Sequence, residues 1–237
     1  MPVASRRLAA TPIAILLLAA SAQAVELATL LGRVATNARF DPAMRAEVQF
    51  ATARPDGTRT TRLTLYGRGR VVRVEMPDGL RALVKPGKCL AAMPGGPLEV
   101  TRGKVIGGSA FLLEDLAPFT PQTLRVPQIS DQSGRGTVVM AEPSGPSPYV
   151  LLVYTIAPDR PFIIGSKFYR WEINNLTKMT RVLDSREIAG HWRPLEVELQ
   201  DLTSGGDTTT ITYDWRPQPD LPASLFTPRG LREDVPR

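Results

Sequence analysis

Residues 59–76 read RTTRLTLYGRGRVVRVEM, and this stretch decides the fold class of the chain. Its apolar residues stand two apart with polar or charged residues between them, and they are Leu63, Leu65, Val72, Val74 and Met76. Such alternation is typical of strands that bury one face and expose the other. Two glycines separate the two runs, so the stretch predicts a pair of antiparallel strands joined by a turn.

The same pattern continues on both sides of this pair. Upstream, Val48 and Phe50 alternate with polar residues within 46–53, and another short run follows at 80–85. The second half of the chain has further strand-like runs at 149–156, 168–173, 179–184, 192–199 and 208–215. Their alternating apolar residues include Tyr169, Trp171, Ile173, Leu195, Val197, Leu199, Ile211, Tyr213 and Trp215. A one-sided sheet of about ten strands is too large to stay flat, so we expect a barrel or half-barrel.

Two segments break the strand pattern. Near the N-terminus, apolar residues with helical spacing predict an amphipathic helix that ends before Asp41: Leu27, Leu30, Leu31, Val34, Ala35 and Ala38. In the middle, a dense apolar cluster fits a short helix that folds back over an apolar surface: Phe111, Leu112, Leu113, Leu116 and Phe119. We expect residues 120–148 to form a loop-like crossover, apart from a short run at 136–141.

Residues 1–24 have the organisation of a signal peptide. Arg6 and Arg7 precede the apolar stretch 13–20, and Ala22-Gln23-Ala24 has the small residues of a signal-peptidase site. We therefore expect export, cleavage after Ala24 and a single mature domain at 25–237. The stretch is too short to cross a membrane as a stable helix. It fits Sec export better than the twin-arginine route, which stays open as the alternative.

The residue counts exclude several kinds of site. One His and one Cys among 237 residues cannot build a Cys/His zinc site or a disulfide. No nucleophile and base stand in a recognisable constellation, so we expect no enzyme, no cofactor and no metal. The formal net charge of +6 at pH 7 comes from scattered Lys and Arg without interleaved aromatic residues. That pattern argues against nucleic acid as a partner.

Several charged or reactive residues have ordinary structural explanations. We interpret His191 as a surface turn residue rather than a general base, and Cys89 as a buried strand residue rather than a dimer-forming thiol. The adjacent pairs Glu114-Asp115 and Glu233-Asp234 suit helix-end or tail charge better than paired acid/base carboxylates. The arginines of the first strands favour a solvated face, with attraction to anionic lipid or an acidic partner as the alternative: Arg59, Arg62, Arg68, Arg70 and Arg73.

A group of short motifs points to a known family. They are Gly108-Ser109-Ala110-Phe111, Glu114-Asp115-Leu116, Met179-Thr180-Arg181-Val182-Leu183-Asp184, Gly190-His191-Trp192-Arg193-Pro194, Glu196-Val197-Glu198, Leu202-Thr203-Ser204-Gly205 and Leu225-Phe226-Thr227-Pro228-Arg229-Gly230-Leu231. In these motifs and in element order, the chain resembles the outer-membrane lipoprotein-sorting (LolA/LolB-like) proteins of the bacterial periplasm. Asn174-Asn175-Leu176-Thr177 departs from the acidic, Gly-containing turn that the family often has.

The resemblance implies a mainly β (α+β) fold, an unclosed antiparallel half-barrel with an N-terminal helix and short lid helices over an apolar cavity. The expected cavity residues are Val48, Phe50, Leu63, Leu65, Val72, Val74, Met76, Tyr169, Trp171, Ile173, Leu195, Val197, Leu199, Ile211, Tyr213 and Trp215. The expected lid residues are Phe111, Leu112, Leu113, Leu116 and Phe119. From the residues alone, the alternative is that both sets pack on each other as a dry core.

The function that the resemblance implies is carriage of lipids or lipoprotein acyl chains between the inner and outer membranes. Its partners would be those chains, an inner-membrane exporter and an outer-membrane acceptor, and the carrier would be a monomer. Two other classes stay open. One is a non-transporting sensor or an accessory module of an inner-membrane lipid exporter, and the other is a hydrolase of an envelope substrate.

Overall fold

The structure is a computed structural model, which describes residues 11–203 and 206–235. Its first half contains α1 (Thr11–Asn37), β1 (Phe40–Arg54), β2 (Gly57–Gly69), β3 (Val71–Glu75), β4 (Arg81–Lys85), β5 (Lys88–Ala92) and β6 (Glu99–Val100). Two single-turn 3₁₀ helices follow, η1 (Leu113–Leu116) and η2 (Pro121–Thr123). The second half contains β7 (Leu124–Ser133), β8 (Gly136–Pro143), β9 (Leu151–Ile156), β10 (Ile163–Tyr169), β11 (Leu176–Ile188), β12 (His191–Asp201), β13 (Thr208–Pro217), η3 (Ala223–Phe226) and η4 (Gly230–Arg232).

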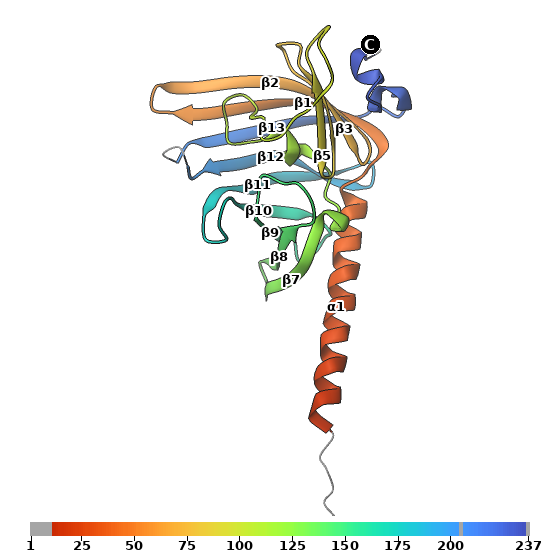
Figure 1. Cartoon of the computed structure of the whole chain (residues 1–237), viewed down its shortest axis with the longest axis vertical. Coiled ribbons are helices and arrows are strands. Elements are labelled where there is room, and N and C mark those ends of the chain that lie inside the picture. Colours follow the sequence, from red (N-terminus) through yellow and green to blue (C-terminus); the bar gives the residue numbers. More distant parts are fainter. Residues whose placement is uncertain (1–10, 204–205, 236–237) are drawn as a thin grey trace, which may run out of the picture.

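The strands of the described residues form one antiparallel sheet of 13 strands in the order β6-β5-β4-β3-β2-β1-β13-β12-β11-β10-β9-β8-β7. Pairing of β1 with β13 joins two meanders, and the sheet curves around the middle of the molecule (Figure 1). The edge strands β6 and β7 do not pair with each other. The sheet is therefore an unclosed half-barrel, and the predicted fold class is confirmed.

The alternating residues of the first meander share the concave face of the sheet. Val74 of β3 pairs with Leu65 of β2, and Leu65 pairs with Ala46 of β1. Ala46 in turn lies opposite Trp215 of β13. These residues belong to one large apolar core that also contains Phe111 and Leu113 of the central segment. The period-two pattern that predicted these strands thus also predicted the face that they bury.

The second half of α1 packs on the far half of the sheet. Leu27, Leu31 and Val34 contact Val139 of β8 and Ile156 of β9 in a separate apolar cluster. The N-terminal part of the helix extends away from the sheet (Figure 1). No helix among the described residues is long and apolar enough to cross a membrane.

The C-terminal end of α1 is held by the hairpin between β11 and β12. The Asn37 side chain accepts a hydrogen bond from the Trp192 amide at 2.8 Å, and the Arg193 guanidinium donates to the Asn37 carbonyl at 2.9 Å. His191 lies at this turn, with its Nε2 atom 2.8 Å from the Asp41 carbonyl oxygen. A cation beside the last carbonyls of a helix is favoured by the helix dipole. Burial lowers the pKa of Arg193 to about 10.

The residues after β13 cover the outer face of β3 and β4. Arg73, fully buried, donates to the carbonyls of Gly230 at 2.6 Å and Glu233 at 2.5 Å, and pairs with Glu75 at 2.6 Å. The interpretation of Arg73 as part of a solvated face is therefore wrong, because the C-terminal segment covers it. Arg59, Arg62, Arg68 and Arg70 are exposed as expected.

Two strand predictions in the second half differ from the structure. Residues 124–133, expected in a loop, form β7, which tolerates Pro127 because it lies at the edge of the sheet. The run expected at 168–173 is instead β10 at Ile163–Tyr169, and the chain turns immediately after it. Trp171 has a φ of 63° in that turn, which no regular strand allows.

Candidate functional site

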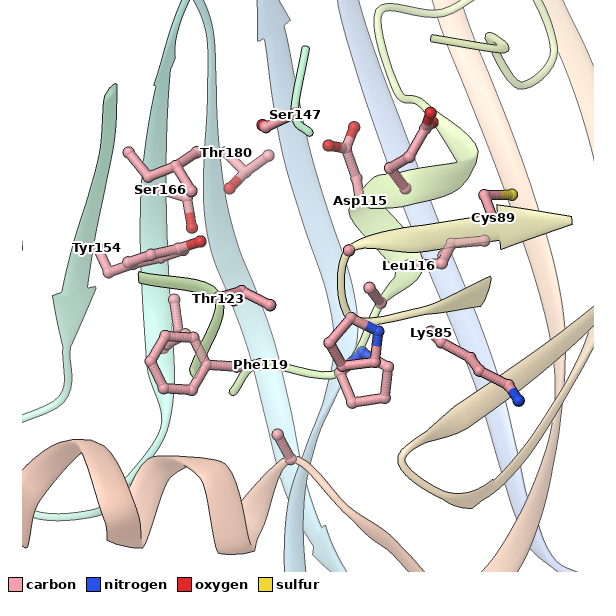
Figure 2. Close-up of a pocket in the computed structure, with 18 of the residues that line it drawn as sticks. Lys85, Cys89, Asp115, Leu116, Phe119, Thr123, Ser147, Tyr154, Ser166 and Thr180 are labelled. Carbon is pink, nitrogen blue, oxygen red and sulfur yellow. The ribbon is translucent and has the colours of Figure 1, made fainter. Parts of the chain in front are cut away.

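A cavity of about 760 Å³ lies between the concave face of the sheet, the central segment and the end of α1 (Figure 2). Its volume is within the range of sites that bind small molecules. Two kinds of wall enclose it. One wall is apolar and includes Leu65, Cys89, Val197, Tyr213 and Trp215. The other, formed by β9, β10 and β11, contributes side chains with hydroxyl groups.

The hydroxyl wall consists of Tyr154, Ser166 and Thr180. Ser166 of β10 pairs with Tyr154 of β9 on one side and with Thr180 of β11 on the other. Adjacent strands are about 4.8 Å apart, so the three side chains project as neighbours from one face of the sheet. Figure 2 shows them grouped on one side of the cavity. We call them the hydroxyl row.

The central segment, residues 109–119, covers the concave face and reaches both walls. Phe111 contacts Phe50 of β1 edge to face, with ring centroids 5.6 Å apart. Phe119 makes a similar contact with Tyr154, with centroids 5.4 Å apart. Leu113 is completely buried in the large core. Leu116 lines the cavity beside Phe111 and Phe119, so the segment separates the core from the cavity.

A buried ion pair fixes this segment to the sheet. Lys178 of β11 donates to the Asp115 carboxylate and to the Ala110 carbonyl, the latter at 3.0 Å. The two charged side chains are only 4% and 3% exposed. The Tyr149 hydroxyl donates to Asp115 at 2.7 Å. Burial lowers the pKa of Lys178 despite the attraction of Asp115, while burial and the Asp115 charge raise the pKa of Tyr149.

The two adjacent acids of the segment have different surroundings. Asp115 is not the simple helix-end charge that was expected, because it binds Lys178 and accepts from the Leu112 amide at 2.7 Å. Glu114 lines the cavity and accepts from the Gly103 amide at 2.6 Å. The described residues contain no group of three or more His, Cys, Asp or Glu that could hold a metal ion.

Cys89 lies on β5, where it is buried and borders the cavity. Burial, with a contribution from the Glu114 charge, raises the pKa of its thiol to about 12. The interpretation of Cys89 as a buried strand residue is confirmed. Its thiol is therefore protonated at neutral pH and a poor nucleophile.

The predicted site residues fall into three groups in the structure. Those that line the cavity are Leu65, Val197, Tyr213, Trp215, Phe111, Leu116 and Phe119. Those in or against the large core are Val48, Phe50, Leu63, Val72, Val74, Met76, Leu195, Leu199, Ile211 and Leu113, whereas Leu112 joins a neighbouring cluster with Phe168. The third group, Tyr169, Trp171 and Ile173, does not line the cavity.

The expected cavity position of Trp171 and Ile173 is wrong. Both lie in the turn after β10, and they are 71% and 70% exposed. From β10, the cavity is lined by Ile163, Ser166 and Phe168 instead. Because side chains alternate along a strand, choosing Tyr169 as an inward residue reversed the assignment of the whole run.

Sequence reasoning missed the hydroxyl row and Lys178 for a common reason. The search for inward residues followed apolar side chains, and a Ser, Thr or Lys on a strand looks like a solvent-facing residue. A signal was present for Tyr154, which alternates with Leu152 and Ile156 in a predicted strand. For Ser166, Thr180 and Lys178, only the strand register identifies the face.

Comparisons with known proteins agree on the fold. The chain is similar to an outer membrane lipoprotein-sorting protein domain from Vibrio parahaemolyticus, with 15% identity, a TM-score of 0.71, and 86% and 97% of the two chains covered. A LolA-superfamily protein from Nitrosomonas europaea matches with 19% identity, a TM-score of 0.70, and 85% and 97% covered. A DUF1329 family protein from Desulfovibrio piger matches with 13% identity, a TM-score of 0.67, and 86% and 96% covered.

No curated protein matches the sequence. A family model described as "-like: Uncharacterized protein" matches residues 99–233, which is more than half of the chain. The protein therefore belongs to the family that this model describes, and it shares its fold with the three solved structures above.

Proposed function

We propose that this protein is a non-catalytic periplasmic carrier that binds the acyl chains of lipids or lipoproteins and moves them between membranes. The cavity of about 760 Å³ carries this proposal, because an apolar wall and a covering segment can shelter an acyl chain from water. Burying a methylene group is worth about 0.8 kcal/mol. Moving a chain of about 15 methylenes from a membrane into water therefore costs about 12 kcal/mol of free energy.

The central segment, residues 109–119, lies against the space that a ligand would fill. Leu116 and Phe119 contact the space that an acyl chain would fill, so contacts with the segment are exchanged for contacts with the ligand. The cavity-lining residues then bind the chain while the large core keeps the sheet folded.

Export is the second part of the proposal, and the sequence of residues 1–24, which has the organisation of a signal peptide, supports it. The predicted cleavage site lies within α1, ahead of Leu27, which is buried against the sheet. The intact mass of the protein recovered from the periplasm should correspond to a chain that begins at Val25. Retention of Met1, or recovery of the protein in the cytoplasm alone, contradicts export.

A binding and transfer assay tests the carrier function. The fluorescent apolar probe 1-N-phenylnaphthylamine should brighten with the protein, and labelled lipid should move faster between donor and acceptor vesicles in its presence. The variant Val197→Phe fills the cavity and should lower both signals. Leu183→Phe, at a 45% exposed position on the neighbouring strand, is the matched control and should leave both unchanged. Probe binding without accelerated transfer contradicts carriage and favours a non-transporting binder.

A further inference from the structure

The hydroxyl row gives one wall of the cavity a specific chemistry. Tyr154, Ser166 and Thr180 lie on three adjacent strands, and all three line the cavity. Among the described residues, no hydrogen-bond partner of these three hydroxyl groups is found. The row therefore presents unused donors and acceptors to the space that a ligand would occupy (Figure 2).

Several other interior hydroxyl groups among the described residues are paired. Thr52 and Thr209 bind each other across β1 and β13 at 3.0 Å. Thr177 donates to the Phe168 carbonyl at 3.0 Å, and Thr123 donates to the Thr120 carbonyl at 2.8 Å. Buried polar groups are nearly always satisfied, because an unmade hydrogen bond is costly. A ligand that fills the cavity must offer partners to the hydroxyl row or lose affinity.

The row favours a neutral acceptor over a charged group. Its side chains carry no formal charge at neutral pH, and burial raises the pKa of Tyr154 above its usual value, with the Asp115 charge acting in the same direction. The Tyr154 hydroxyl therefore keeps its proton at neutral pH and can donate it to a hydrogen bond. The Phe119 ring packs edge-on against Tyr154, so apolar surface lies next to the donor. A ligand that fits both the Tyr154 donor and the apolar surface beside it has a carbonyl group attached directly to a hydrocarbon chain.

We propose that the hydroxyl row binds the acyl ester carbonyl groups of a diacyl ligand, while its chains lie against the apolar wall. This inference rests on the proposed function and narrows it from any apolar ligand to acyl esters. Two sources share this chemistry, namely a glycerolipid and the diacylglyceryl group of a lipoprotein. Both place two ester carbonyls close together at the start of two chains.

The test compares ester and ether ligands of equal length. Dioleoylglycerol and its dioleyl ether analogue are competed against 1-N-phenylnaphthylamine, with a synthetic diacylated lipopeptide as a third ligand. The wild-type protein should bind the ester about 2- to 10-fold more tightly than the ether, the range expected for one net hydrogen bond. Tyr154→Phe and Ser166→Ala should each reduce this preference, by weakening ester binding more than ether binding. Tyr213→Phe removes a phenol from the same cavity outside the row and should retain the preference.

Each outcome decides one point. Equal affinity for ester and ether in the wild type overturns the inference, as does a loss in Tyr154→Phe that is the same for both ligands. Failure of the wild type to bind the apolar probe overturns the proposed function instead. An ester preference that falls in Tyr154→Phe and Ser166→Ala supports the inference. The ligand that then binds more tightly, dioleoylglycerol or the lipopeptide, shows whether a glycerolipid or a lipoprotein is the source of the ester.

Discussion

The two halves of the concave face differ although they belong to one continuous sheet. Beneath η1, the strands β1 to β5 form most of the large core, in which Val48, Phe50 and Leu113 are almost completely buried, although Leu65 and Cys89 of these strands also border the cavity. On β9 to β11, the same face borders a cavity and has the hydroxyl row where the first half has Leu and Val. The difference teaches that one face can supply both stability and a binding site, with the central segment as the border between them.

The largest effect on stability is expected at the ion pair that holds the central segment to the sheet. Lys178→Met leaves the Asp115 carboxylate buried without its cation, which typically costs about 3–5 kcal/mol of unfolding free energy. Arg125→Ala breaks the exposed pair with Glu142 and should cost about 1 kcal/mol or less. Urea denaturation of both variants measures the difference. Equal losses would show that the central segment does not need the buried pair.

The next largest effect on stability is a difference between Leu113 and Leu116, which lie in the same short helix, η1. Leu113→Ala opens a void in the large core and should cost about 2–5 kcal/mol of unfolding free energy. Leu116 is only partly buried and borders the cavity, so Leu116→Ala should cost less than half as much. The same denaturation experiment measures both, and apolar probe binding should change more in Leu116→Ala. A greater loss of stability in Leu116→Ala contradicts the division into core and cavity.

A smaller effect concerns the Cys89 thiol on the apolar wall. Burial raises its pKa from the ordinary value of 9.0 to about 12, so the folded state holds this proton more tightly. Stability from this group is therefore lost as the pH rises above about 9. Between pH 8 and 10 the wild type should lose up to about 1 kcal/mol more than Cys89→Ala, allowing for solvent screening at the cavity. Parallel pH profiles of the two proteins would contradict a buried thiol.

The smallest effect on stability is expected at Trp171. Because this side chain is 71% exposed, Trp171→Phe should change the unfolding free energy by about 0.5 kcal/mol or less. The change in tryptophan fluorescence on adding dioleoylglycerol should persist in this variant. It should fall in Trp215→Phe, because Trp215 borders the cavity. Loss of the ligand response in Trp171→Phe alone would move the binding site to the turn after β10.

The two halves also differ in how well the sequence predicted them. In the first meander, Leu63, Leu65 and Val74 alternate with polar residues, and tight turns fix the strand ends. Periodicity alone therefore identified both strands and face. Around β10 the pattern is ambiguous, because the turn contains Trp171 and Ile173, which look like strand residues. An error in the strand boundary then reversed the assigned face.

The remaining site residues could not be predicted because their roles depend on contacts between distant segments. Asp115 and Lys178 are far apart in sequence, and no local pattern indicates that they pair. Arg73 looks like any polar strand residue until η4 and the residues after it cover it. In contrast, the central apolar cluster was found from composition alone, although its division between core and cavity depends on the fold.

The strand order gives the central segment a mechanical consequence. Since β6 and β7 are the two free edges of the sheet and follow each other in sequence, residues 101–123 tether one edge to the other. Attachment of Asp115 to Lys178 divides this tether, and the arm of eight residues, 116–123, can extend at most about 29 Å. The length of that arm limits how far the β7 edge can move from the attachment point. It therefore sets an upper bound on the aperture, and with it on the width of any cargo that enters while the pair is intact.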